Sequence, residues 1–291
     1  MHIPDGFLST PVWAGLATLS VPSIGMLARR AQAGLKDARL PLMGVMGAFV
    51  FAAQMINFPV GIGTSGHLVG GALLAATLGP APAAIVMTAI LIIQALVFQD
   101  GGLLALGANV FNMAIAGVLA GYWPYRLLAR TRARLFGIAL GGFLSVFVSA
   151  LLCLGELSLS GVRIPSHALG LGLIVFCITG LLEGAITLAV LGSLEKMNPR
   201  WLRAPETDGR PALILLGLFA LVLVSAGFLA ASALPDGLER VAGLAGLGSK
   251  DVAAAAAEPW LRQAALGLSG LVATFLACYL LGRWIVRWRN A

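Results

Sequence analysis

Apolar runs separated by short polar segments fill the chain from end to end. A helix that crosses a membrane needs about 20 mostly apolar residues, and most of these runs reach or approach that length. Residues 67–78 are short and rich in glycine, so we expect this segment to be partly sunk beneath its neighbours. The pattern predicts nine spans, at residues 7–28, 42–58, 67–78, 82–98, 103–122, 135–155, 168–191, 211–233 and 261–284.

A polar segment at residues 195–210 divides these predicted helices into a group of seven and a group of two. We therefore predict an all-α polytopic membrane protein, with a seven-helix bundle in residues 1–203 and a two-helix tail in residues 204–291. The tail helices are joined by a loop at about residues 234–259, whose alanine-rich part fits either a helix or a spacer.

Composition supports the membrane assignment and excludes several classes of protein. Hydrophobic residues make up 59% of the chain and charged residues 11%, against about 25% charged residues in ordinary soluble domains. So few charges cannot cover the surface of a soluble fold of this size. Soluble enzymes, nucleic-acid-binding proteins and disordered proteins are therefore excluded, and the isoelectric point of about 10.0 reflects basic residues in loops beside the membrane.

The basic residues are distributed unevenly about the predicted spans. If the N-terminus faces outward, 15 of the 19 lysines and arginines fall on the inner side. Because cytoplasmic loops of membrane proteins are enriched in lysine and arginine, this asymmetry predicts an outer N-terminus and an inner C-terminus.

The first residues, MHIPDGF, combine a terminal amine with a histidine at position 2. No basic segment precedes the first apolar run, so we expect no cleavable signal peptide and a mature chain that keeps Met1. The Met1 amine, the deprotonated amide nitrogen of His2 and Nδ1 of its imidazole are able to bind one metal ion in a common plane. Such a planar set of nitrogens favours Ni(II) or Cu(II) over Zn(II), which prefers a tetrahedron.

His67 is the candidate for the fourth ligand of this plane. It ends the segment GIGTSGH, whose glycines permit a close approach of the backbone and positive φ angles. Thr64 and Ser65 are placed to hydrogen-bond the other ring nitrogen of this histidine. Each histidine taken alone also fits a plainer interpretation, His2 as a loosely held terminal residue and His67 as a packed or helix-capping group. The compact Pro-Asp-Gly turn after the N-terminal histidine favours the metal site.

Further polar residues lie within or beside the apolar runs. Most fit interhelical hydrogen bonds, and Asn57 is the best placed to support a metal site because it adjoins the glycine-rich segment. Glu183 lies in the middle of a span, where it must be protonated or paired, and His167 fits an interfacial polar residue. The set at membrane depth is Gln54, Asn57, Gln94, Asn109, Asn112 and Glu183.

Three segments carry a family resemblance: MHIPDGFLS at the N-terminus, GTSGHLVGG around His67, and QDGGLLALGANVFNMAIAG at residues 99–117. They resemble the CbiM/NikM proteins, the substrate-binding membrane components of energy-coupling-factor transporters for cobalt and nickel. The resemblance covers residues 1–203 and implies a seven-helix bundle with an outward N-terminus. It also implies that the Met1 amine, the backbone nitrogen and imidazole of His2, and the His67 imidazole bind the metal.

The tail carries a second resemblance. The segment LPDGLERVAG at residues 234–243 is similar to the PDGLE loop of the small NikN component, which implies a fused chain of the NikMN type. This fusion is more typical of the nickel branch than of the cobalt branch. The transported ion is therefore expected to be Ni(II), with Co(II) as the alternative, and no permanent cofactor is expected.

The resemblance also implies partners. These are a transmembrane coupling (T) component and a cytoplasmic ATPase of the ABC type, in the lipid of the cytoplasmic (inner) membrane of a prokaryote. No phosphate-binding loop of the form GxxxxGKS or GxxxxGKT occurs in the sequence, so ATP hydrolysis is expected in a partner subunit.

Two other classes of function fit the sequence less well. A membrane enzyme would need a zinc motif such as HExxH or an intramembrane nucleophile with its base, and the sequence contains neither signature. A passive metal channel would need a ring of repeated ligands, and a tight chelate would trap an ion instead of conducting it. Nickel import is therefore the predicted function, with a channel as the alternative from a different class.

Overall fold

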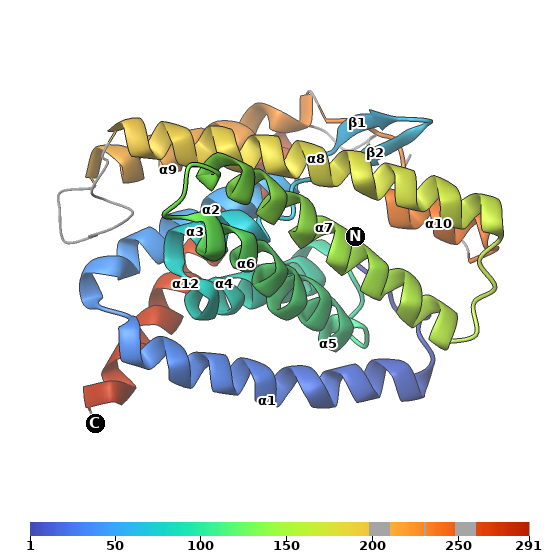
Figure 1. Cartoon of the computed structure of the whole chain (residues 1–291), viewed down its shortest axis with the longest axis horizontal. Coiled ribbons are helices and arrows are strands. Elements are labelled where there is room, and N and C mark those ends of the chain that lie inside the picture. The colour runs from blue at the N-terminus through green and yellow to red at the C-terminus, as the bar shows by residue number, and fades with distance from the viewer. Residues whose placement is uncertain (198–209, 230, 248–259, 291) are drawn as a thin grey trace.

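The computed structural model describes residues 1–197, 210–229, 231–247 and 260–290, most of which are helical. The boundary predicted at residue 203 and the alanine-rich part of the tail loop lie outside the described residues. Figure 1 shows long helices gathered into one body, with α1 along one side. The helices in chain order are α1 (Thr10–Gly34), η1 (Asp37–Arg39), α2 (Leu40–Gln54), α3 (Gly71–Leu78), α4 (Pro80–Ile93), η2 (Gln94–Phe98), α5 (Leu106–Asn109), η3 (Val110–Gly117), α6 (Val118–Leu128), α7 (Arg134–Leu159), α8 (Ser166–Met197), α9 (Arg210–Ala226), η4 (Gly227–Leu229), α10 (Gly237–Leu244) and α12 (Trp260–Asn290).

Six helical segments among the described residues are long and apolar enough to cross a membrane. They are α1, α4 with its π-helical extension η2, the continuous stretch from α5 through the π-helical η3 to α6, and the single helices α7, α8 and α12. The described part of α9 is apolar but shorter. The chain is therefore a multi-pass helical membrane protein, while nine spans and an outer N-terminus stay predictions.

The short helix expected at residues 67–78 is present but begins only at Gly71. Seven of its eight residues are buried, and it packs against α4, α6 and α7, so the prediction that it is sunk beneath its neighbours is confirmed. Gly70 and Gly79 bracket it with φ angles of +79° and +86°, which only glycine adopts without strain. The turns at these two glycines limit α3 to eight residues and connect it directly to α4.

A small β-hairpin departs from the all-helical prediction. Its strands, β1 (Phe58–Gly61) and β2 (Thr64–Gly66), are antiparallel, and the turn residues Ile62 and Gly63 both have positive φ angles. A turn of this kind matches the twist of a hairpin. The span predicted to end at residue 58 therefore ends at Gln54, because the chain has already entered the hairpin.

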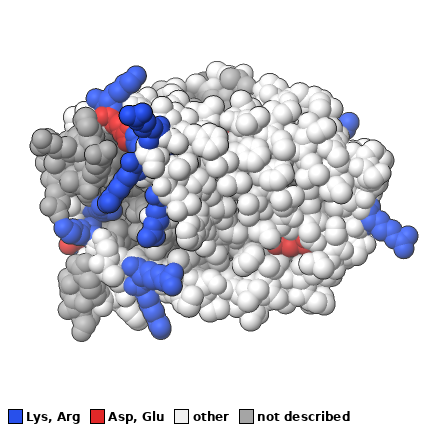
Figure 2. Space-filling model, viewed as in Figure 1, with Lys and Arg blue, Asp and Glu red and all other residues white. Residues whose placement is uncertain are grey.

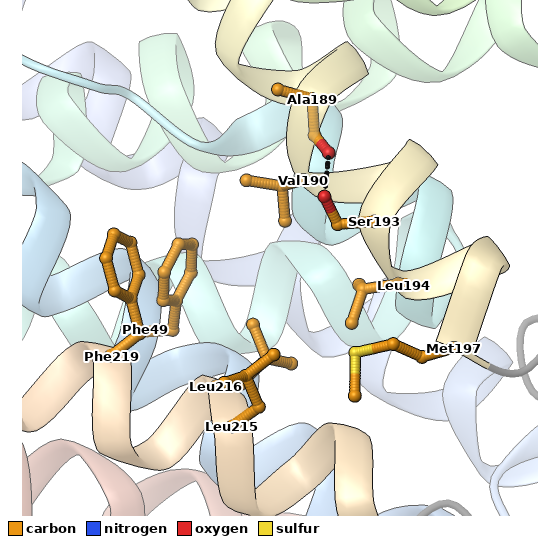
Figure 3. A pocket seen from close by; sticks show the side chains of 9 residues that line it. All are labelled: Phe49, Ala189, Val190, Ser193, Leu194, Met197, Leu215, Leu216 and Phe219. Carbon is orange, nitrogen blue, oxygen red and sulfur yellow. Dashed lines mark hydrogen bonds between the residues drawn. The ribbon is translucent and has the colours of Figure 1, made fainter.

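The described parts of the tail pack on the first part of the chain. α12 contacts α2 and α9, and α10 contacts α8 and β2. Between α8 and α9 an apolar groove of about 260 Å³ opens, shown in Figure 3. Its one hydroxyl, on Ser193, donates to the carbonyl of Ala189 in its own helix, so the groove walls offer hydrocarbon. The lining residues are Phe49, Ala189, Val190, Ser193, Leu194, Met197, Leu215, Leu216 and Phe219.

Charged side chains gather at one end of the face seen in Figure 2. Lysines and arginines cluster where α1 ends and the C-terminus lies, and an almost uncharged belt follows. The hairpin and α10 lie toward the opposite end in Figure 1. An apolar belt with a basic end is the distribution expected of a protein that spans a bilayer with that end inside.

Candidate metal centre

The residues that precede α1 are buried and held in place. Met1, His2 and Ile3 are exposed by only 7%, 8% and 0%. Asn109 of α5 holds Ile3 on both sides, since its side-chain oxygen accepts from the Ile3 N–H at 2.8 Å and its amide donates to the Ile3 carbonyl at 3.1 Å. The Gly102 N–H donates to the same carbonyl at 2.8 Å. The N-terminus is therefore a fitted part of the bundle, contrary to the plainer interpretation of a loose end.

Asp5 fastens the turn that follows. Its carboxylate accepts hydrogen bonds from the N–H groups of Leu103, Leu104 and Ala105, the three residues just before α5. A carboxylate is favoured at this position because the first N–H groups of a helix lack partners within the helix. A side chain at Gly102 would collide with Asp5, so glycine is required there for this contact.

The Met1 amine and His67 meet, although 66 positions separate them in the chain. The amine nitrogen lies 2.9 Å from Nε2 of His67, and the imidazole rings of His2 and His67 stack with centroids 5.4 Å apart and 6° between their planes. Nδ1 of His67 lies 2.9 Å from the Leu68 carbonyl, which only accepts hydrogen bonds, so Nδ1 carries the proton. Nε2 therefore presents its lone pair to the Met1 amine.

The charge state of His67 suits a ligand. Burial and the neighbouring Met1 ammonium lower the pKa of His67 to about 3, so its imidazole is neutral at physiological pH. A neutral imidazole nitrogen is the form that binds a metal ion.

Asp236 is a site residue that sequence reasoning missed. Its Oδ2 lies 2.7 Å from the Met1 amine and 4.0 Å from Nε2 of His67. Burial by itself lowers the pKa of the Met1 amine, but the Asp236 carboxylate outweighs that effect and the net pKa is raised. Burial likewise opposes ionisation of Asp236, yet the adjacent ammonium holds its pKa below the usual value. The PDGLE segment was recognised as a family feature, but nothing in the sequence indicated which atoms it touches.

Asp100 is a second carboxylate that sequence reasoning did not single out. Its Oδ2 lies 3.3 Å from Nδ1 of His2, and its side chain is 45% exposed. Nε2 of His2 is buried and has no hydrogen-bond partner among the described residues. Both nitrogen donors of the N-terminal segment, the amine and the imidazole Nδ1, thus face a carboxylate in this structure.

Glu183 holds the loop that follows His67. This carboxylate in α8 accepts from the N–H groups of Val69 and Gly70, both at 2.7 Å, immediately before α3. Gln54 donates to the Val69 carbonyl at 2.6 Å. Glu183 therefore has the partners that the sequence did not reveal, and they are the main-chain groups that position His67.

The residues proposed to support the site make contacts other than those expected. The Thr64 hydroxyl donates to the Gly61 carbonyl, and the Ser65 hydroxyl donates to the Leu234 carbonyl of the tail. The prediction that these hydroxyls bond the His67 ring is therefore wrong, because Nδ1 of His67 bonds the Leu68 carbonyl instead. The Asn57 carbonyl accepts from the Ser232 N–H, so this residue also ties the hairpin region to the tail.

His167 lies apart from the contacts that join Met1, His2 and His67. It is exposed in the first turn of α8, consistent with the interfacial polar residue that the sequence predicted.

A small cavity of about 10 Å³ lies at the site. That space holds the centre of about one water-sized sphere, so it suits a single small occupant. Within the described residues no group of three or more His, Cys, Asp or Glu side chains is arranged to hold a metal ion. A metal site here would therefore need donors besides these four kinds of side chain. The cavity is lined by Met1, Ser65, Gly66, His67, Phe176, Thr179, Asp236 and Gly237.

The apolar helices are long enough to span a membrane, and a small polar site is buried among their connecting segments. Together they define an integral membrane protein with an internal polar site. The sequence pattern of the CbiM family, described as the cobalt uptake substrate-specific transmembrane region, matches residues 2–201. The chain belongs to the CbiM family.

Relatives extend the similarity beyond this region. A protein of Archaeoglobus fulgidus, provisionally named as the fused nickel transport protein NikMN, is 36% identical over 256 residues, which cover 85% of this chain and 83% of that protein. The cobalt transport protein CbiM of Thermosediminibacter oceani is 32% identical and covers 67% of this chain and 84% of its own length. A crystal structure of a truncated transition metal transporter superposes with a TM-score of 0.61 at 34% identity, covering 68% of this chain and 99% of that one. The chain is thus a member of a cobalt and nickel transport family.

Proposed function

We propose that this chain captures Ni(II) at the outer face of the membrane, as the substrate-binding component of an ATP-driven energy-coupling-factor transporter. Co(II) is the alternative ion. The observation that carries the proposal is the buried Met1 amine, which lies 2.9 Å from the unprotonated Nε2 of His67. Burial of a terminal amine is costly, because the amine loses its hydration.

The proposed ligands are four nitrogens in one plane. The Met1 amine, the His2 amide nitrogen and His2 Nδ1 form two fused chelate rings, and His67 Nε2 closes the square. Metal–nitrogen bonds of about 2.0 to 2.1 Å place neighbouring nitrogens of a square about 2.9 Å apart. The separation of 2.9 Å between the amine and Nε2 supports adjacent places in that square.

Metal binding then replaces contacts of the empty site. The ammonium and the His2 amide each lose a proton, and His2 Nδ1 leaves the Asp100 carboxylate that lies 3.3 Å away. Asn109 supports the chelating residues indirectly, because it holds Ile3, which directly follows them. The Leu68 carbonyl keeps the His67 ring in the tautomer that binds through Nε2.

Nickel is preferred because the similarity to a fused nickel transport protein covers 85% of this chain and so extends into the tail. A planar set of nitrogens suits Ni(II) and Cu(II) by geometry, and Cu(II) ranks above Ni(II) in intrinsic affinity. Selection of nickel in the cell therefore depends on the metal that is available as well as on the site.

Energy for transport must come from partners, since the sequence contains no phosphate-binding loop. We propose a transmembrane coupling component and a cytoplasmic ABC-type ATPase, whose nucleotide cycle reorients the bundle and releases the ion inward. The small volume of the cavity, about 10 Å³, favours capture of one ion over passive flow through a channel.

The test is a metal titration of the purified full chain with its native Met1, beside a chain extended by two residues at the N-terminus. Ni(II), Co(II), Cu(II) and Zn(II) are titrated in detergent, and released protons are counted. We expect about two protons per ion and at least a roughly 100-fold loss of Ni(II) affinity on extension, because the ligand amine becomes an amide.

Two substitutions complete this test. His67→Ala is expected to lose tight binding, and His167→Ala, which changes an exposed histidine of the same chain, is expected to keep it. Unchanged binding by the extended chain would reject the proposed ligand set.

A further inference from the structure

Asp236 is carried by the tail but lies inside the site formed by the N-terminus. Its Oδ2 is 2.7 Å from the Met1 amine, and its side chain is only 15% exposed. We propose that Asp236 is the counter-ion of the metal site: it balances the charge of the Met1 ammonium in the empty chain and that of the metal complex in the loaded chain. This inference rests on the proposed function, because it takes Met1, His2 and His67 as the ligands.

The two oxygens of Asp236 have separate partners. Oδ1 accepts from the Glu239 N–H at 2.8 Å and caps α10, while Oδ2 faces the Met1 amine. The Glu239 carboxylate accepts in return from the Asp236 N–H at 2.9 Å, which completes a capping box. The side chain is thus held in one orientation by its own helix, and one oxygen stays directed at the site.

The backbone around Asp236 is anchored to the strand that leads to His67. The Ser65 N–H donates to the Pro235 carbonyl at 2.9 Å, and the Ser65 hydroxyl donates to the Leu234 carbonyl at 2.7 Å. On the other side Gly237 packs so closely on Val175 and Phe176 of α8 that a Cβ atom would lie within 3.0 Å of both. Asp236 therefore has little freedom to withdraw while the tail loop stays in place.

The net charge next to this carboxylate is the same in the metal-free and in the metal-bound chain. Beside Asp236 the metal-free site contains one ammonium, with a charge of +1, whereas the more exposed Asp100 faces His2. The loaded site contains a divalent ion and one amide anion, with a net charge of +1 as well, after two protons have left. A buried charge without a partner is costly, so one fixed carboxylate stabilises both states. A monovalent ion would leave the complex neutral and Asp236 unpaired, so the carboxylate favours divalent ions.

The test compares nickel binding by the wild-type full chain, Asp236→Asn and Glu239→Gln. Asparagine still caps a helix and removes only the charge at the amine. Glu239→Gln removes a neighbouring carboxylate but keeps an oxygen that accepts from the Asp236 N–H, so the orientation of Asp236 is preserved and this variant is the matched control. Asp236→Ser, a second capping residue, replaces the asparagine variant if that variant does not fold.

We expect Asp236→Asn to weaken Ni(II) binding about 10- to 100-fold, as is usual for residues that support metal ligands, and Glu239→Gln to bind within about twofold of wild type. The visible absorption of the bound nickel should keep its wavelength in Asp236→Asn, because the four nitrogens are unchanged. A merely structural residue would instead disturb the ligand geometry and this spectrum.

Three results would overturn the inference. They are wild-type affinity in Asp236→Asn, an equal loss in Glu239→Gln, and a shifted nickel spectrum in Asp236→Asn, which would indicate a ligand or a disturbed site. A wild-type chain that binds neither nickel nor cobalt tightly would reject the proposed function itself, and the inference with it.

Discussion

At the scale of residues, main-chain groups supply or orient several of the candidate ligands of this site. The candidate ligands include a terminal amine and a backbone amide, and a backbone carbonyl, that of Leu68, sets the His67 tautomer. Asn109 acts on the backbone as well, because it pairs with both the N–H and the carbonyl of Ile3. A site built in this way depends on how firmly the first three residues are held.

Asn109 therefore gives a prediction that distinguishes the structure from the sequence-based expectation. Asn109→Ala removes two hydrogen bonds from Ile3, so we expect Ni(II) affinity to fall about 10- to 100-fold while the chain stays folded. Asn57→Ala, at the residue that the sequence favoured, is the matched control, since the Asn57 contact with Ser232 uses the backbone carbonyl. Isothermal titration of both variants decides between them, and equal affinities would contradict this account of the N-terminal segment.

At the scale of elements, short and irregular segments place the site between long helices. The hairpin turn at Ile62 and Gly63 folds β2 back toward the bundle, and α3 starts four residues after His67. The N–H groups that precede α3 have no helical partners, and Glu183 of α8 accepts from two of them. The same carboxylate thus begins a buried helix and fixes the loop that presents the imidazole.

Glu183→Gln tests this arrangement. The amide keeps one oxygen for Val69 or Gly70 but turns an N–H₂ group toward the other N–H, leaving that donor buried without a partner. We expect a loss of about 1 to 3 kcal/mol in the free energy of unfolding, seen as a lower melting temperature in detergent, together with weaker Ni(II) binding.

The matched control for that substitution is Glu156→Gln in α7. Glu156 accepts from the Asn112 side chain, and glutamine keeps an oxygen for that bond. A Glu183→Gln chain that melts and binds nickel like the Glu156→Gln chain would show that the N–H groups before α3 do not need the carboxylate.

At the scale of the whole molecule, the site and the basic end lie toward opposite ends of the long helices (Figures 1 and 2). With the basic end inside, as the sequence predicts, an ion captured at the site would have to move along these helices to be released inward. The cavity at the site, about 10 Å³, is too small to be part of an open pore, which agrees with the proposed movement of the bundle during transport.

This separation predicts that the chain binds but does not accumulate nickel by itself. Vesicles that contain only this chain should bind Ni(II) in proportion to the protein present, and uptake into the lumen should require the coupling component, the ATPase and ATP. The control is the same assembly with an ATPase whose phosphate-binding lysine is replaced. Flow of nickel down its gradient through the chain alone would instead support the channel alternative.

Several features follow from the sequence because they depend on local pattern. The membrane-spanning helices follow from apolar runs, the short buried helix from its length and glycines, and the pairing of a terminal amine with His2 from their adjacency. The hairpin was missed because three- and four-residue strands leave almost no periodic signal beside a membrane span. Thr64 and Ser65 were misassigned because a hydroxyl bonds whichever carbonyl the fold brings closest.

The sequence by itself determined that this is a helical membrane protein of a metal transport family, and it predicted a planar metal site from the nitrogens of Met1, His2 and His67. Only the tertiary structure decided which groups surround them. Asp236 follows Met1 by 235 positions and Asn109 follows Ile3 by 106, and no local pattern relates residues so far apart. Such contacts depend on how the helices pack and where the tail loop lies. Because these polar groups are buried, each one that lost its partner would destabilise the site.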